Sequence, residues 1–223
     1  MGYRDYSFVF IVSYARSGST LVQSLLNSLA GWQIRGENNN ALFHVQKLVG
    51  SIRHARNIHG HRPTEHDAPW YGADKLTPRL FADRMLTTFV DGVLKPDDGV
   101  TTIGFKEIRH TPYFMTDFEF QEYMEFILES FPESRIVFNS RNAEDVCRSA
   151  WLKDENPEAV RRDVAVADRR FSDIARTSDR ATHLFYDEYV NDHGKIRELF
   201  DFLGAEYQPE AIDAVFSKRL THG

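Results

Sequence analysis

The chain has 223 residues with 27 Lys or Arg against 33 Asp or Glu, and this net charge of −6 argues against a general binder of nucleic acids or anionic membranes. The one cysteine, Cys147, excludes an intramolecular disulfide and a cysteine-based zinc site. No apolar run reaches the roughly 20 residues of a membrane span and the start has no signal-peptide core, so we predict a cytoplasmic protein without a membrane span.

Short apolar runs alternate with helical patterns along the chain. The predicted strands are 8–12, 101–106, 135–140 and 182–186, with 32–35 as a weaker fifth. Most are continuously apolar, which is typical of parallel strands covered on both faces. The helical patterns lie at 21–29, 77–93, 117–131, 143–152, 157–176 and 193–203. We therefore predict a P-loop-like α/β fold, with three α/β/α layers and a central parallel sheet of about five strands.

Residues 36–76 differ from the rest, because they are polar and rich in histidine. We predict a long loop or helical insertion within a single domain, residues 1–223. The histidines around HGH form only a weak metal pattern, so we predict no metal site. Trp70 and Tyr71 either stack on a bound molecule or pin this segment to the core, and the sequence leaves both open.

The segment YARSGSTL, residues 14–21, follows the first predicted strand and opens the first helix. This layout gathers backbone N–H groups and the positive end of a helix dipole, which favours an anion. Gly18 allows close approach of the backbone, and Arg16 adds a positive fork. The lysine of nucleoside-triphosphatase loops is missing, since Ser19 stands in its place. The segment predicts an anion site, with an ordinary helix cap as the alternative.

A second cationic motif, RIVFNSRNAEDVCRSAW, begins with the predicted strand 135–140. Arg141 comes directly after that strand, and the helical pattern that follows places Ser149 two turns into a helix. An arginine at the carboxyl end of a strand lies on the edge where α/β folds bind ligands. The motif therefore predicts a second anion site. The alternative is a surface pair between Arg141 and Glu144 or Asp145.

These motifs, in this order, resemble the sulfotransferase family that uses 3′-phosphoadenosine 5′-phosphosulfate (PAPS). YARSGSTL is similar to the family's 5′-phosphosulfate loop, and FPESRIVFNSRNAEDVCRSAW is similar to its 3′-phosphate motif. The segment YDEYVNDHGKIRELFDFLG, residues 186–204, is similar to the family's C-terminal segment. The resemblance implies PAPS as donor and 3′-phosphoadenosine 5′-phosphate (PAP) as product. Sulfuryl transfer from a phosphate oxygen needs neither the missing lysine nor a metal.

The resemblance also implies residues for the donor. The implied 5′-phosphosulfate residues are Arg16, Ser17, Gly18, Ser19 and Thr20. The implied 3′-phosphate residues are Arg141 and Ser149, and Tyr186 matches an aromatic residue near the adenine. The family often closes the 3′-phosphate site with a late basic loop. Whether the tail with Lys218, Arg219 and Gly223 does so here is left open.

The catalytic residues depend on the branch of the family. The cytosolic small-molecule branch has Lys-Thr-His, and GFKEIRH departs from it, because Glu107 and Ile108 follow Lys106 and His110 comes too late. IRGENNN is similar to a Gly-Glu segment of the tyrosylprotein and several bacterial branches. That resemblance implies Glu37 as the catalytic base, with Lys106 and Arg16 as catalytic cations. Glu107 remains the alternative base.

We therefore predict a sulfotransferase that acts on a hydroxyl of an acceptor. The acceptor is predicted to be a carbohydrate or another small molecule, with residues 36–76 as its lid, because that segment is polar and aromatic. Two alternatives remain open: a divergent P-loop kinase, and a magnesium-independent module that binds a nucleotide or anion. The sequence does not indicate the oligomeric state.

Overall fold

The computed structural model describes residues 2–218. Within them, the chain divides into two compact units, a smaller one of residues 2–3 and 40–95 and a larger one of residues 4–39 and 96–218. The single domain predicted for 1–223 stays a prediction. No helix among the described residues is long and apolar enough to cross a membrane.

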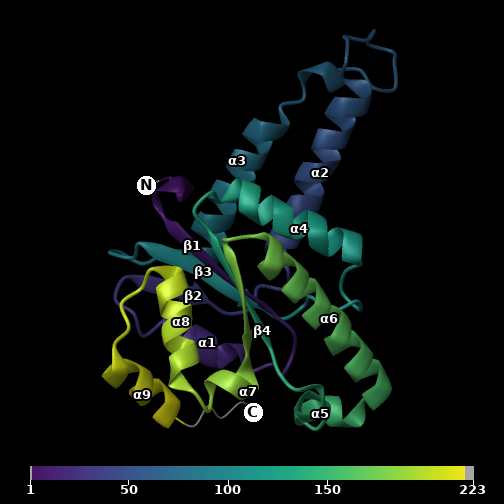
Figure 1. The fold of residues 1–223 in the computed structure, drawn as a ribbon. Helices are drawn as coiled ribbons and strands as arrows, with labels where there is room; N and C mark the ends of the chain where they lie inside the picture. Colours follow the sequence, from purple (N-terminus) through teal and green to yellow (C-terminus); the bar gives the residue numbers. More distant parts are fainter. Residues whose placement is uncertain (1, 219–223) are drawn as a thin grey trace. The chain divides into compact units, whose positions relative to one another are not determined.

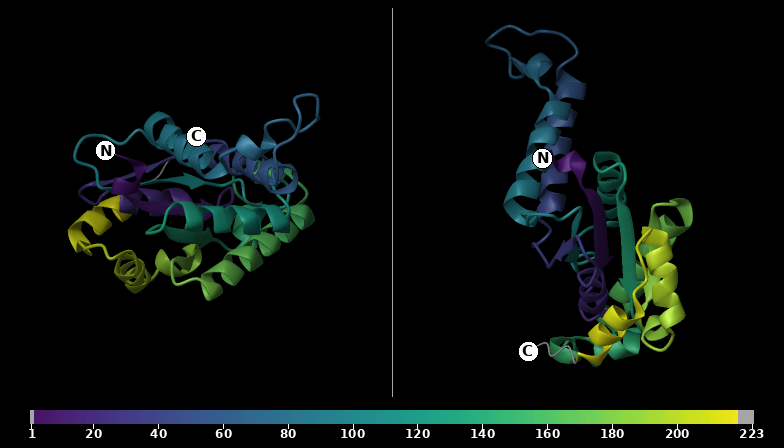
Figure 2. Two further views of the ribbon diagram at one scale, coloured as in Figure 1. Left: turned by 90° about the horizontal axis from the view of Figure 1, so that it is seen from above. Right: turned by 90° about the vertical axis from the view of Figure 1, so that its left-hand side faces the viewer.

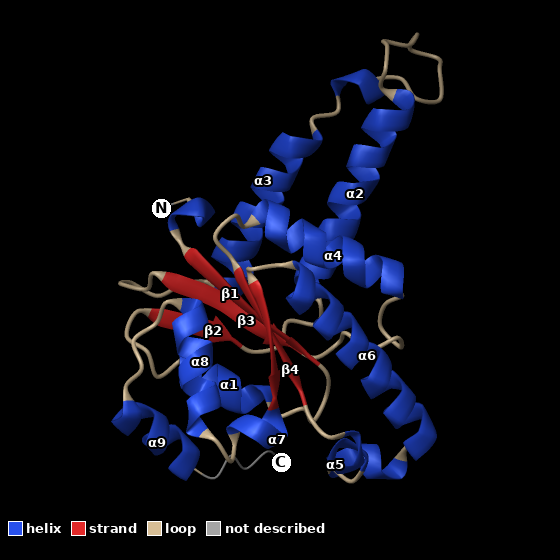
Figure 3. Cartoon of the chain, in the orientation of Figure 1, coloured by secondary structure: helices blue, strands red, loops and turns tan. Residues whose placement is uncertain are grey.

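The larger unit is built on a parallel sheet of five strands (Figures 1 and 3). The strands are β1 (Ser7–Ser13), β2 (Trp32–Arg35), β3 (Thr102–Glu107), β4 (Arg135–Ser140) and β5 (Ala181–Phe185). Their order is β2-β3-β1-β4-β5, and every pair is parallel. β2 and β3 lie on one side of β1 and β4 and β5 on the other, so the chain changes sides between β3 and β4. Such a switch point is where open α/β sheets bind ligands, at the carboxyl ends of the strands.

Helices cover both faces of this sheet, so the predicted three-layer α/β fold is confirmed. Phe10 of β1 packs against Phe105 of β3 and against Phe131, which follows α4. Val9 and Ile11 face the other way, into a core shared with α1, α8 and α9. This alternation along β1 buries both of its faces, and it explains the continuous apolar run in the sequence.

The helices of this unit largely follow the predicted pattern. They are α1 (Ser19–Leu26), α4 (Asp117–Ser130), α5 (Ala143–Cys147), α6 (Pro157–Thr177), α7 (Tyr186–Tyr189), α8 (His193–Leu203) and α9 (Pro209–Ser217), with 3-10 turns at Tyr3–Asp5 and Ala150–Asp154. The helix predicted over 143–152 is wrong in its second half. The α-helix ends at Cys147, and Ala150 has a φ of 51° that interrupts it. Ser149 therefore precedes the 3-10 turn rather than lying inside a helix.

The smaller unit contains α2 (Ala41–His59) and α3 (Pro78–Phe89), which lie side by side (Figure 2). A 3-10 turn, Ala73–Lys75, precedes α3, and a π-helical turn, Val90–Leu94, continues it. The sequence left a long loop or a helical insertion open for 36–76, and α2 is a helix within it whose buried stripe includes Leu42, Gln46 and Val49. Trp70 stacks on His59 with ring centroids 3.8 Å apart, so this aromatic residue has a partner within its own unit.

Candidate active site

A pocket of about 480 Å³ lies at the carboxyl ends of the central strands, and all of its lining residues belong to the larger unit. The lining residues are Ala15, Arg16, Gly18, Ser19, Thr20, Leu21, Glu37, Lys106, Ile108, Arg141, Trp151 and Tyr186. Both motifs that predicted anion sites are thus at one place. Of the predicted site residues, Ser17 and Ser149 do not line the pocket directly.

The loop after β1 holds Arg16 in an unusual backbone conformation. The N–H of Ser17 donates to the carbonyl of Tyr14 over 3.4 Å, which closes a tight turn. Arg16 stands at the third position of this turn with a φ of 65°, in the left-handed region that favours glycine. A non-glycine residue in that region costs about 1–3 kcal/mol and is retained mainly at functional sites.

Gly18 continues the loop and begins α1 with a φ of 87°. A Cβ at this position would collide with the ring of Tyr186, which packs directly on the glycine backbone. The ring also lies under the guanidinium of Arg141, 4.7 Å from its centroid, within the range of a cation–π contact. Gly18 therefore serves two geometric needs, a positive φ and the close approach of an aromatic ring.

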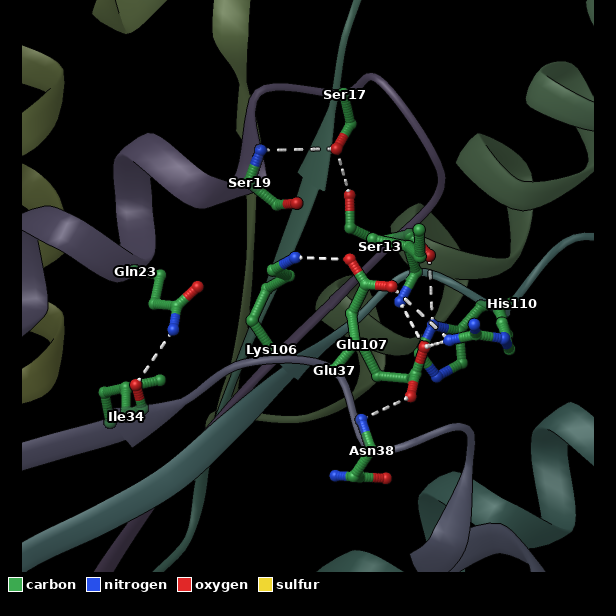
Figure 4. A network of polar contacts seen from close by, with 12 residues as sticks. Ser13, Ser17, Ser19, Gln23, Ile34, Glu37, Asn38, Lys106, Glu107 and His110 are labelled. Carbon is green, nitrogen blue, oxygen red and sulfur yellow. Dashed lines mark hydrogen bonds and ion pairs between the residues drawn. The ribbon is translucent and has the colours of Figure 1, made fainter. Parts of the chain in front are cut away.

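The hydroxyl of Ser17 points into the protein rather than into the pocket (Figure 4). Ser13 donates its hydroxyl hydrogen to the carbonyl of Asn139 at 2.6 Å, so the 2.5 Å contact between the two serines requires Ser17 as the donor. Asn139 in turn donates its amide to the carbonyl of Ser17 at 2.9 Å. Ser17 thus fixes the loop onto β1 and β4.

The two predicted anion motifs are joined by hydrogen bonds between their side chains and backbone. The Nε of Arg16 donates to the hydroxyl of Ser149 over 2.8 Å, and the Nη1 of Arg141 donates to the carbonyl of Arg16 over 3.4 Å. The Nε of Arg141 is buried and has no hydrogen-bond partner among the described residues. Within residues 2–218, neither arginine forms an ion pair; Glu144 pairs with Arg161 instead. The surface pair considered for Arg141 is therefore wrong.

Tyr14 holds the peptide unit of Arg141 from both sides. Its hydroxyl accepts the N–H of Arg141 at 2.9 Å and donates to the carbonyl of the same residue at 3.1 Å. Burial raises the pKa of Tyr14 well above its usual value, and the charge of Asp168 adds to this shift. The hydroxyl therefore keeps its proton, and Arg141 has a fixed backbone from which to present its guanidinium.

Lys106 and Glu37 meet at a second wall of the pocket, formed by the end of β3 and the segment after β2. The Nζ of Lys106 lies 2.7 Å from Oε1 of Glu37, and the lysine side chain is only 8% exposed (Figure 4). Lys106 comes from β3, whereas Glu37 follows β2, which Gln23 of α1 holds through a hydrogen bond to Ile34. Glu107 is fully buried and is not among the lining residues, as expected from strand alternation.

His110 lies behind this wall, fully buried and outside the set of lining residues. Its Nδ1 is 3.0 Å from the carbonyl of Ser13, which can only accept, so this nitrogen carries the hydrogen. Burial lowers the pKa of His110 to about 4, although the nearby Glu107 works against this shift. The ring is therefore neutral near pH 7 and supports the loop.

Some features of the pocket were not predicted from the sequence. Trp151, a residue that is 58% exposed, lines the pocket from the 3-10 turn after Ser149. Its position as the last residue of the second cationic motif, 135–151, is the signal that the sequence offered. Lys218 is exposed and does not line the described pocket, and Arg219 and Gly223 lie outside the described residues. Among residues 2–218 no group of His, Cys, Asp and Glu is arranged to hold a metal ion.

The sequence and the fold were compared with those of known proteins. Residues 9–209 match the family model described as "Sulfotransferase family". A sulfotransferase domain from the curacin biosynthetic pathway shares 16% identity at a TM-score of 0.52, over 93% of this chain and 77% of that one, which supports the fold. Sulfotransferase STF9 from Mycobacterium avium shares 11% identity at a TM-score of 0.44, over 95% of this chain and 67% of that one. No curated protein sequence matches the chain.

Proposed function

The chain belongs to the sulfotransferase family, and from this premise we propose that it moves a sulfuryl group from PAPS to a hydroxyl of an acceptor and releases PAP. One observation carries the proposal. Arg16 and Arg141 line one pocket without a carboxylate partner among the described residues, and Glu37, paired with Lys106, lines the same pocket. A nucleotide with phosphate groups at both ends suits two unpaired arginines and needs no magnesium.

The pocket fits the donor at several points. The 5′-phosphosulfate would lie at the start of α1, held by Arg16 and by the residues that follow Ser17, namely Gly18, Ser19 and Thr20. The 3′-phosphate would lie against Arg141 and Ser149, where a buried guanidinium nitrogen lacks a partner. Tyr186, packed between Gly18 and Arg141, would flank the adenine. Ser17 would contribute through its place in the loop, because its hydroxyl is engaged in the interior.

Three side chains would carry the chemistry. The acceptor oxygen attacks sulfur while the bond from sulfur to the phosphate oxygen of PAPS breaks, and the electron pair of that bond stays on PAP. Lys106 and Arg16 would stabilise the charge on the bridging and sulfuryl oxygens, and Glu37 would accept the proton of the acceptor hydroxyl. Until the donor arrives, Lys106 and Glu37 neutralise each other at 2.7 Å.

We propose a carbohydrate as the acceptor. We also propose that the chain belongs to the bacterial and tyrosylprotein-like branch of the family. The branch rests on the Gly36-Glu37 segment and on Lys106, and the pairing of these two side chains supports it. The acceptor rests on the polar and aromatic character of residues 36–76, whose proposed role as a lid stays a prediction. Tyr71 is 65% exposed and is the ring in that segment most available to a sugar.

The test is transfer of radiolabelled sulfate from PAPS to a panel of neutral and acidic oligosaccharides, phenols and alcohols, in the presence of a chelator. We expect labelled product from at least one carbohydrate, formed roughly 10²–10⁴ times more slowly with Glu37→Gln. Magnesium-dependent turnover of ATP would instead favour a kinase. PAP binding without transfer to any acceptor would favour a non-catalytic nucleotide-binding module.

A further inference from the structure

Glu107 is a fully buried carboxylate one residue beyond Lys106, outside the pocket. Its Oε2 accepts the backbone N–H of Asn38 at 3.1 Å, and its Oε1 accepts the N–H of Ile108 at 2.9 Å (Figure 4). Arg109 donates to the same Oε1 at 2.7 Å. A buried carboxylate is tolerated only when it is paired and hydrogen-bonded, and these contacts meet that condition.

Two of these contacts lead to Glu37. Asn38 is its neighbour in the chain, so Glu107 fixes the backbone that carries the Glu37 side chain. Arg109 uses the same nitrogen, Nη1, to reach both Oε1 of Glu107 and, over 3.4 Å, Oε2 of Glu37. The Glu37 carboxylate is thus held at both oxygens, by Lys106 on one and by Arg109 on the other.

We infer that Glu107 and Arg109 are positioning residues that keep the Glu37 carboxylate in place when Lys106 turns to the donor, an inference that rests on the proposed function. In the proposed mechanism Lys106 both neutralises Glu37 and stabilises negative charge on the transferred group. A single ammonium group that moves toward the donor interacts less strongly with the Glu37 carboxylate. Arg109 supplies a second cation that stays with Glu37, and Glu107 keeps that guanidinium oriented.

The backbone explains why Arg109 is a suitable anchor. Arg109 forms an isolated β-bridge with Tyr14, the first residue of the loop after β1. Tyr14 also holds the peptide unit of Arg141. Arg109 is therefore attached through its backbone to the donor-binding loop and through its side chain to the proposed base. Because side chains alternate along a strand, Lys106 lines the pocket while Glu107 points away from it and holds Arg109 and Asn38.

The test compares Arg109→Lys with a matched control, Arg161→Lys, which removes the same planar fork from an exposed pair with Glu144. We expect Arg109→Lys to lower kcat about 10- to 100-fold, because a base displaced by about 1 Å loses that much, with PAP affinity nearly unchanged. The control should be near normal. Loss of PAP affinity in parallel with kcat would overturn the positioning role.

A double variant shows whether the loss of activity in Arg109→Lys acts through Glu37 or through a general disturbance of the structure. If Arg109 acts through Glu37, then Arg109→Lys should cost almost nothing further once Glu37→Gln is present. Full additivity of the two losses in kcat would overturn the inference. Glu107→Gln should behave like Arg109→Lys, since it weakens the same link.

Hydrogen exchange gives a readout that needs no activity. Glu107→Gln should speed exchange of the Asn38 amide, with global stability measured alongside to correct for general loosening. Unchanged exchange at Asn38 would overturn the role of Glu107. If the wild-type protein transfers no sulfuryl group although Asn38 exchange rises, the proposed function fails while the support of the Glu37 segment stands.

Discussion

The two walls of the pocket differ in whether their positively charged side chains are paired with carboxylates. At the wall formed by the segments after β1 and β4, Arg16 and Arg141 have no carboxylate partner among the described residues. At the wall formed by the end of β3, Lys106 pairs with Glu37, and Arg109 pairs with Glu107 next to it, outside the pocket lining. The first wall has positive charge available for a ligand, whereas the second has its charge already balanced.

This difference suggests that the two walls have different roles in binding and catalysis. Unpaired guanidinium groups gain most from a dianionic phosphate, because they lose little when they desolvate toward it. A balanced cluster binds anions weakly, but it fixes the orientation of its carboxylate. We therefore assign donor affinity to the first wall and proton transfer to the second, and each variant below is chosen to separate affinity from turnover.

The largest expected effect is on turnover, from Glu37→Gln. Removing a general base typically costs a factor of roughly 10²–10⁴ in rate, and the change leaves the donor-binding arginines intact. Steady-state kinetics with PAPS, together with calorimetry of PAP binding, should show a collapse of kcat without weaker binding. Near-normal turnover would remove Glu37 from the mechanism and return Glu107 to consideration as the base.

Arg141→Ala should act on affinity instead. It removes a charged hydrogen-bond donor from the 3′-phosphate, so PAP binding should weaken by roughly 1.5–3 kcal/mol. Adenosine 5′-phosphosulfate lacks that phosphate and should bind almost as before. Arg148→Ala, a change of the same type in the same segment, serves as the control. Equal losses for both nucleotides would make Arg141 structural.

Arg16→Gly should separate stability from binding. Glycine relieves the strain of the positive φ, worth about 1–3 kcal/mol, against a cost of about 1 kcal/mol or less for its greater freedom in the unfolded chain. Chemical denaturation should therefore show unchanged or higher stability, while PAP affinity falls. A destabilised variant would indicate that the hydrogen bond to Ser149 holds the loop together more than it prepares a site.

Tyr14→Phe should give the smallest effect. It deletes the hydroxyl that holds the peptide of Arg141, at a cost of about 0.5–1.5 kcal/mol for a typical hydrogen bond. PAP affinity should fall by less than in Arg141→Ala, and combining the two changes should give little further loss. A Tyr14→Phe variant that binds PAP normally would show that Arg141 needs no such support.

The strands were predictable because their apolar runs reflect burial on both faces. The predicted strand 135–140 coincides with β4, and 32–35 coincides with β2. The two cationic motifs were predictable because backbone geometry at a strand end determines their position. That both motifs meet in one pocket follows from the strand order, which places β4 beside β1.

Other features depend on tertiary contacts that a pattern does not contain. The carbonyl of Ser17 is held by the side-chain amide of Asn139, 122 residues away in the chain. For residues 36–76 the pattern left a loop or a helical insertion open, because basic and polar residues dilute the buried stripe of α2. The break after Cys147 rests on the positive φ of Ala150, a residue whose type favours helix.

The central claim, a donor site for PAPS without magnesium, is tested most directly by calorimetry with PAP, ATP and NADH side by side, each with and without Mg²⁺. The account predicts that PAP binds most tightly, that its affinity does not depend on Mg²⁺, and that Arg141→Ala weakens it. Tighter binding of ATP with Mg²⁺ than of PAP would contradict the account.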